Sequence, residues 1–265
     1  MAHMRALIEL PAGRRRRRGH RTAHPGREGV WWRPDRIGWW MGVLFAIGST
    51  CFGVAAMASQ WSSVTRPGIG ITFFVGSIFF TSAAFLQLHE AINAQRGPEH
   101  LTRAAFRRWW SWEPGRIDWL AAAVQFVGTL FFNVNTFAAM NDALDSKQEL
   151  LRVWTPDVIG SICFLVASEL AYAEVCNAWV CFRNRTLSWW IVAINMLGSI
   201  AFGVSALASV IEPSTGEPVS AAIANSTTAL GGWCFLAGAL MLIVETGRET
   251  PDPSPAIDQP TEVPA

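Results

Sequence analysis

Apolar and polar residues are segregated along this 265-residue chain into six long apolar segments and the polar connections between them. The segments hold 128 residues, and of the 41 Asp, Glu, Lys and Arg residues only Glu169 lies within them. Each is close to the ~20 residues with which an α-helix crosses ~30 Å of hydrocarbon. The pattern therefore predicts an all-α, polytopic membrane protein with six transmembrane helices and excludes a soluble globular domain. The predicted spans are 39–59, 69–88, 119–140, 158–173, 189–211 and 219–244.

A short pattern recurs in these segments. Each odd-numbered span has a Trp, a Gly nine residues later, Ser or Thr next, and a Phe four residues after the Gly. Each even-numbered span has a Gly followed by Phe at four residues, and a Glu stands fourteen residues after that Gly, just beyond the end of the span. The small-residue pairs are Gly48-Ser49, Gly76-Ser77, Gly128-Thr129, Gly160-Ser161, Gly198-Ser199 and Gly231-Gly232. This periodicity predicts three tandem helical hairpins of the same orientation, with a pseudo-threefold axis along the membrane normal.

The repeat divides the chain into hairpins at 31–95, 113–181 and 182–247. A Trp-led helix with a central Gly-Ser and Phe, followed by a Gly-Ser helix that ends in Glu, resembles the YrhK-like integral membrane domain, here in three copies. The resemblance implies a membrane hairpin unit and no activity. An interfacial amphipathic segment is expected at 96–112, where Arg and Trp are interleaved. Disorder is expected in the Arg-rich arm 1–30 and the Pro-rich tail 248–265.

Charge predicts the orientation. Of 21 Lys and Arg residues, 18 lie in the connections on the side of the two termini. The positive-inside bias then places both termini in the cytoplasm, and we expect the plasma membrane as the location. The run Arg14 to Arg18 favours contact with anionic lipid headgroups over nucleic acid, because it precedes a membrane span.

Small residues at matching depth in all six helices are typical of close helix packing, and lining a narrow path is the alternative interpretation. Glu169 interrupts the repeat within hydrocarbon, where a carboxyl is unfavourable unless it is protonated or paired. Tyr172 lies one turn further along the same face, and Gln125 and Asn195 occupy equivalent places in their hairpins. These four residues form the candidate intramembrane polar site.

Three carboxylates recur at the cytoplasmic ends of the even helices, namely Glu90, Glu174 and Glu245, with His89 beside the first. Paired with Arg36 and Arg116 they would tie neighbouring hairpins together, whereas unpaired they would form an acidic ring at the inner mouth of a cation path.

Catalytic, phosphate-binding and metal motifs are missing from the sequence, so neither an enzyme nor a cofactor is predicted. The five Cys include Cys176 and Cys181, whose spacing is weak evidence for a metal; the others fit small packing residues. We expect passage of a small solute or ion, linked to cations or protons. The alternative is a non-transporting membrane scaffold that recruits partners through its cytoplasmic tails. A homo-oligomer with a path between protomers is a third interpretation.

Overall fold

A computed structural model of the chain describes residues 30–61, 65–94, 108–141, 143–179, 181, 185–212, 215 and 218–248. Its long helices are α2 Ile37–Ala58, α3 Arg66–Asn93, α4 Ile117–Ala138, α6 Thr155–Cys176, α7 Leu187–Ala208 and α8 Ala221–Arg248. Several predicted features lie outside the described residues. These are residues 1–29 of the arm, which include the run Arg14 to Arg18, most of the segment 96–112, and the tail from residue 249.

Six helices in the described part of the chain are long and apolar enough to cross a membrane. Their outer surfaces carry exposed apolar side chains such as Val54, Val134 and Leu207. Such a surface suits lipid rather than water. The prediction of an all-α protein with six membrane-spanning helices is confirmed.

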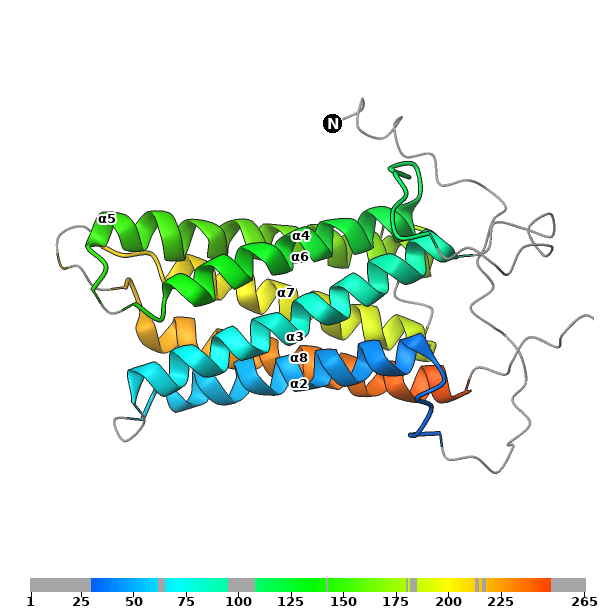
Figure 1. Cartoon of the computed structure of the whole chain (residues 1–265), viewed down its shortest axis with the longest axis horizontal. Helices are drawn as coiled ribbons and strands as arrows, with labels where there is room; N and C mark the ends of the chain where they lie inside the picture. The colour runs from blue at the N-terminus through cyan, green and yellow to red at the C-terminus, as the bar shows by residue number, and fades with distance from the viewer. Residues whose placement is uncertain are drawn as a thin grey trace, which may run out of the picture.

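The helices form a closed ring in chain order. Each contacts the next along the chain, and α8 returns to pack against α2. Successive helices run in opposite directions (Figure 1). Residues 30 and 248 therefore lie at one end of the bundle, together with Trp39, Trp119 and Trp189, and we call this end the Trp end. The short helix α5, Ser146–Glu149, marks the opposite end, the α5 end.

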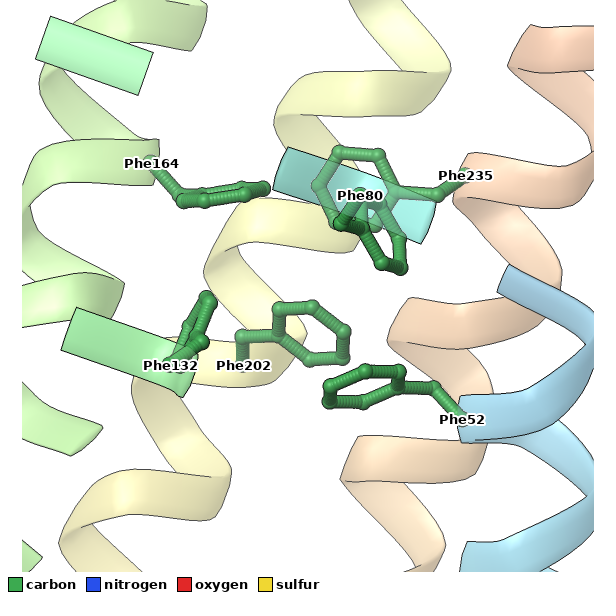
Figure 2. Packing of buried hydrophobic residues seen from close by; sticks show 6 residues of the cluster. All are labelled: Phe52, Phe80, Phe132, Phe164, Phe202 and Phe235. Atoms are coloured by element: carbon green, nitrogen blue, oxygen red, sulfur yellow. The ribbon is translucent and has the colours of Figure 1, made fainter. Parts of the chain in front are cut away.

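Six phenylalanines, one from each long helix, fill the centre of this ring, and we call them the aromatic core. Rings from α2, α4 and α7 lie 5.9–6.4 Å apart between centroids, and rings from α3, α6 and α8 lie 5.6–6.2 Å apart. Figure 2 shows these sets as two layers of three. The aromatic core consists of Phe52, Phe132 and Phe202 in one layer and Phe80, Phe164 and Phe235 in the other.

The glycines before each Phe explain how the rings fit. A Cβ added to Gly160 would lie 3.0 Å from the ring of Phe132, and one added to Gly128 would lie 3.0 Å from the ring of Phe164. In the same way, the Gly of each helix faces the Phe of its partner between α2 and α3 and between α7 and α8. Each Gly therefore makes room for the Phe of the other helix in its hairpin, which brings the helices close together.

The α6 helix begins earlier than the sequence predicts. The predicted spans leave residues 141–157 as the connection between the third and the fourth, but α5 continues through a π-helical turn, Leu150–Trp154, directly into Thr155. Pro156 has no N–H and would clash with the carbonyl four residues before it in an α-helix, and a wider turn relieves that clash. The Thr155 hydroxyl donates to the Leu150 carbonyl at 2.7 Å within this turn. Asp157 is consequently inside the helix.

Candidate functional site

A small cavity lies on the α5 side of the aromatic core. Its volume is about 30 Å³, enough for about one water molecule. Three rings of the aromatic core form part of its wall, and the rest of the wall is polar. The lining residues, which define the axial cavity, are Phe52, Phe132, Phe202, Asp157, Ser205 and Thr228.

Asp157 brings a carboxyl group into the axial cavity. Its Oδ1 atom accepts a hydrogen bond of 2.8 Å from Nδ2 of Asn135 on α4. No Lys or Arg among the described residues lies within 4.0 Å of this carboxyl group, and Arg152, the basic residue closest in sequence, is exposed. The carboxyl group is oriented by an amide without being neutralised by a cationic side chain.

Two hydroxyl groups face Asp157 across the axial cavity. Ser205 Oγ donates to the Ala224 carbonyl at 2.9 Å and lies 2.6 Å from Oγ1 of Thr228. Because the single hydroxyl hydrogen of Ser205 is used on Ala224, Thr228 must donate in the bond between the two hydroxyls. Both hydroxyl hydrogens are therefore used, and lone pairs remain on each oxygen.

The residues of this site occupy matching positions in different hairpins. Asp157 stands three residues before Gly160, as Thr228 stands three before Gly231; Asn135 follows Gly128 by seven residues, as Ser205 follows Gly198. Both hairpins thus place a hydrogen-bonded polar pair at this depth. In the first hairpin the equivalent residues are Ala55 and Phe73, which are apolar.

Glu169 is differently placed. It is the only charge within the six predicted spans, but α6 extends beyond the predicted span 158–173 and also contains Asp157. Its equivalents Phe85 and Leu240 are 39% and 41% exposed on the lipid-facing surface. Glu169 itself is partly buried and makes no hydrogen bond or ion pair within the described residues.

The structure does not bring the four predicted polar residues together by hydrogen bonds. Asn195 packs against Gly238: a Cβ added to Gly238 would lie 2.2 Å from Oδ1 of Asn195. The Tyr172 hydroxyl donates to the Cys181 carbonyl, and Nε1 of Trp189 donates to Tyr172 at 3.3 Å. Gln125 is partly buried on α4.

The carboxylates at the Trp end are partly buried at the ends of α3, α6 and α8. Glu245 accepts a hydrogen bond from Ser188 at the start of α7. His89 lies between Phe85 and Trp109, with ring centroids 6.4 and 5.5 Å away. Glu90 and Glu174 occupy the corresponding ends of α3 and α6. In the ranges that the structure describes, no three His, Cys, Asp or Glu residues gather as metal ligands would.

Arginines at the Trp end form ion pairs in the turns that precede α2 and α4. Arg116 forms ion pairs with Glu113 at 2.7 Å and with Asp118, and donates to the Ala91 carbonyl of the first hairpin at 3.0 Å. In the first hairpin, hydrogen bonds from Arg33 lower the pKa of the Asp35 carboxyl to about 2. These arginines thus form ion pairs within their own turns.

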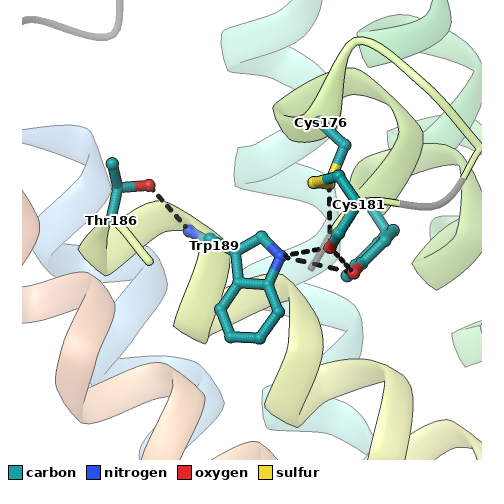
Figure 3. The surroundings of a disulfide bond; sticks show 5 residues. Cys176, Cys181, Thr186 and Trp189 are labelled. Atoms are coloured by element: carbon teal, nitrogen blue, oxygen red, sulfur yellow. Dashed lines mark hydrogen bonds between the residues drawn. A yellow bond between two sulfur atoms is a disulfide. The ribbon is translucent and has the colours of Figure 1, made fainter. Parts of the chain in front are cut away.

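Cys176, the last residue of α6, forms a disulfide with Cys181, the last residue of the second hairpin (Figure 3). The carbonyl of Cys181 accepts a 3.0 Å hydrogen bond from Nε1 of Trp189. Trp39 makes the matching bond, at 2.7 Å, to the carbonyl eight residues before it. In this structure the two sulfur atoms are joined to each other, so neither is a thiolate that could bind a metal.

The chain matches no protein-family model, no curated protein and no solved structure.

Proposed function

We propose that this protein is a non-conducting membrane scaffold, built from three copies of a YrhK-like hairpin. The observation that carries the proposal is the aromatic core. Six rings fill the bundle axis, and their side chains are 1–6% exposed. An ion on that axis would meet two successive layers of aromatic rings without a polar ligand, and it would have to shed water to pass them.

Contacts between neighbouring hairpins also favour a permanently packed bundle. Ser77 and Thr136 join the first hairpin to the second through hydroxyl groups 3.0 Å apart. Ser168 and Ser199 join the second to the third at 2.8 Å. Such hydrogen bonds between membrane helices each contribute about 0.6 kcal/mol on average.

The contact between the third and first hairpins is closer still. A Cβ on Gly232 would lie 2.7 Å from the backbone nitrogen of Gly53. This explains why Gly232 stands where the other even helices have Ser. A larger hollow, about 390 Å³, opens on the outer surface between α2, α3 and α4 and not along the axis.

The scaffold would recruit its partners at the cytoplasmic side of the plasma membrane. We infer that both termini lie there, with Arg14 to Arg18 bound to anionic lipid headgroups. Trp residues gathered at the Trp end support an interfacial position, since Trp is enriched at the membrane–water boundary. Trp32, Trp109 and Trp112 are each 70–75% exposed.

Flux measurements test this proposal. Purified full-length protein in proteoliposomes should give no flux of Na⁺, K⁺ or protons above empty liposomes, with or without a pH gradient. In cells, removal of residues 1–28 or 251–265 should abolish function while Glu169→Gln leaves it intact. Robust flux by the wild-type protein would overturn the scaffold proposal.

Asp157 favours a second candidate, the linked passage of cations or protons. A carboxyl group on the bundle axis near mid-membrane is a typical feature of such proteins. This candidate requires the aromatic core to rearrange during each passage. It predicts flux that Asp157→Asn abolishes and that Glu169→Gln does not.

A further inference from the structure

We propose that the axial cavity binds one small monovalent cation, Na⁺, at Asp157, in competition with a proton. The proposal concerns binding and does not depend on whether the protein conducts. It rests on the donors and acceptors that face the cavity, on its volume and on its place along the axis.

The axial cavity offers more oxygen lone pairs than the described residues supply with hydrogen-bond donors. Thr228 and Ser205 have used their hydroxyl hydrogens on Ser205 and on the Ala224 carbonyl, respectively. Asn135 supplies one N–H to Oδ1 of Asp157, and the other carboxylate oxygen receives no hydrogen bond from the described residues. Oxygen ligands of this kind suit hard cations.

The charge of Asp157 has to be balanced within the axial cavity. The groups that face it are neutral on every adjoining helix: phenyl rings on α2, α4 and α7, an amide on α4, and hydroxyls on α7 and α8. A carboxylate near mid-membrane without a counter-charge costs several kcal/mol, so the group takes up a proton or a cation. One carboxylate balances one positive charge, which favours a monovalent ion over a divalent one.

The size and position of the cavity restrict the ligand further. About 30 Å³ admits a single dehydrated ion of the size of Na⁺ or one water molecule, and excludes organic cations. The aromatic core separates the cavity from the Trp end. Asp157 is three residues, or ~4.5 Å of helix, nearer the α5 end than Gly160. Exchange with solution therefore takes place from the α5 end.

Binding of ²²Na⁺ to the full-length protein in lipid nanodiscs tests this inference. The wild-type protein should bind one Na⁺ per chain, with less bound as the pH is lowered, because protons compete for the same oxygen. Asp157→Asn should abolish binding. Thr228→Val keeps the carboxylate and the shape of the side chain while removing one ligand, so Kd should rise about tenfold.

Glu169→Gln is the matched control, since it removes another carboxylate from the same helix, and it should bind Na⁺ like the wild type. Infrared spectra should show a protonated carboxyl band that Na⁺ diminishes and that is missing in Asp157→Asn. Thermal melting of each variant reports folding; if Asp157→Asn does not fold, Thr228→Val carries the test. Wild-type protein that binds no Na⁺, or binding that Thr228→Val leaves unchanged, would overturn the inference. Absence of flux leaves it standing, whereas flux refutes only the scaffold proposal.

Discussion

Replacing Phe164 by Ala tests the claim that the aromatic core holds the bundle together. Phe164 is 1% exposed, and its ring centroid lies 5.1 Å from that of Phe132 and 5.6 Å from that of Phe235, with two further rings within 6.4 Å. Aromatic pairs contribute about 0.5–1.5 kcal/mol each beyond area burial, and truncation of a buried Phe costs about 3–5 kcal/mol in water-soluble proteins.

The loss expected in a membrane is smaller than in water, because lipid chains are as apolar as the protein interior and the removed ring gains little from leaving lipid. What remains is the lost packing and the cavity that the residue leaves behind. The four ring contacts, counted with incomplete additivity, give a decrease in unfolding free energy of about 2–4 kcal/mol.

The unfolding free energy can be measured by titrating the protein from mild detergent into SDS and following Trp fluorescence. Phe137→Ala on α4 is the control, because Phe137 is 63% exposed on the lipid-facing surface and its truncation removes the same atoms together with one ring contact, to Phe74 at 5.5 Å. We expect that control to lower the unfolding free energy by less than about 1 kcal/mol. Equal losses for both variants would refute the claim that the axis is the centre of stability.

Three further predictions concern the contacts between hairpins and the Trp end. Gly232→Ser should lower the unfolding free energy by about 1–3 kcal/mol, because the atoms that its side chain would meet belong to the α2 backbone. Gly115→Ala is the control and should change the unfolding free energy by less than about 0.5 kcal/mol, because nothing lies within 4 Å of the added Cβ. SDS titration of both variants measures the two changes. Ser168→Ala should cost about 0.5–1 kcal/mol in the same titration through loss of its buried hydrogen bond, and an unchanged free energy would mean that this bond is not stabilising. Although Cys176 and Cys181 are joined in the structure, their disulfide should be reduced to two thiols in growing cells, since a cytoplasmic Trp end faces a reducing compartment, and it should form again on addition of oxidant. Acid quenching followed by polyethylene-glycol maleimide counts the thiols, and a disulfide in untreated cells would contradict the predicted orientation.

Segregation of charge was enough to predict the six spanning helices. Lipid requires every backbone polar group to be satisfied within the helix, so an uncharged segment of about 20 residues has little structural choice. The Gly and Phe positions were also visible in the sequence, but their pairing was not. A spacing of four residues indicates that Gly48 and Phe52 share one face of α2. It does not indicate that Gly48 packs against Phe80, or Phe52 against Gly76, on the next helix.

Asp157 was missed because Pro156 beside it indicates the beginning of a helix. The π-helical turn from Leu150 to Trp154 lets the helix continue through Pro156, and sequence patterns contain no reliable signal for such a turn. The signal that was available lay in the repeat, because Thr228 and Asp157 stand at the same distance before Gly231 and Gly160. Glu169 is an isolated charge in the sequence, but its equivalents Phe85 and Leu240 in the other hairpins lie exposed on the lipid-facing surface.

The position of polar residues relative to the aromatic core gives the bundle its chemical asymmetry. Each of the three hairpins supplies two Phe residues to the aromatic core, so the hairpins are chemically equivalent there. One helical turn towards the α5 end, the first hairpin has Ala55 and Phe73 while the other two have hydrogen-bonded polar pairs. A purely structural layer would favour apolar residues in every hairpin, since a buried carboxyl group is costly in hydrocarbon. The cost at Asp157 is offset if the group holds a cation, and the departure of two hairpins from the apolar pattern of the first therefore marks the axial cavity as the place where this bundle can bind a ligand.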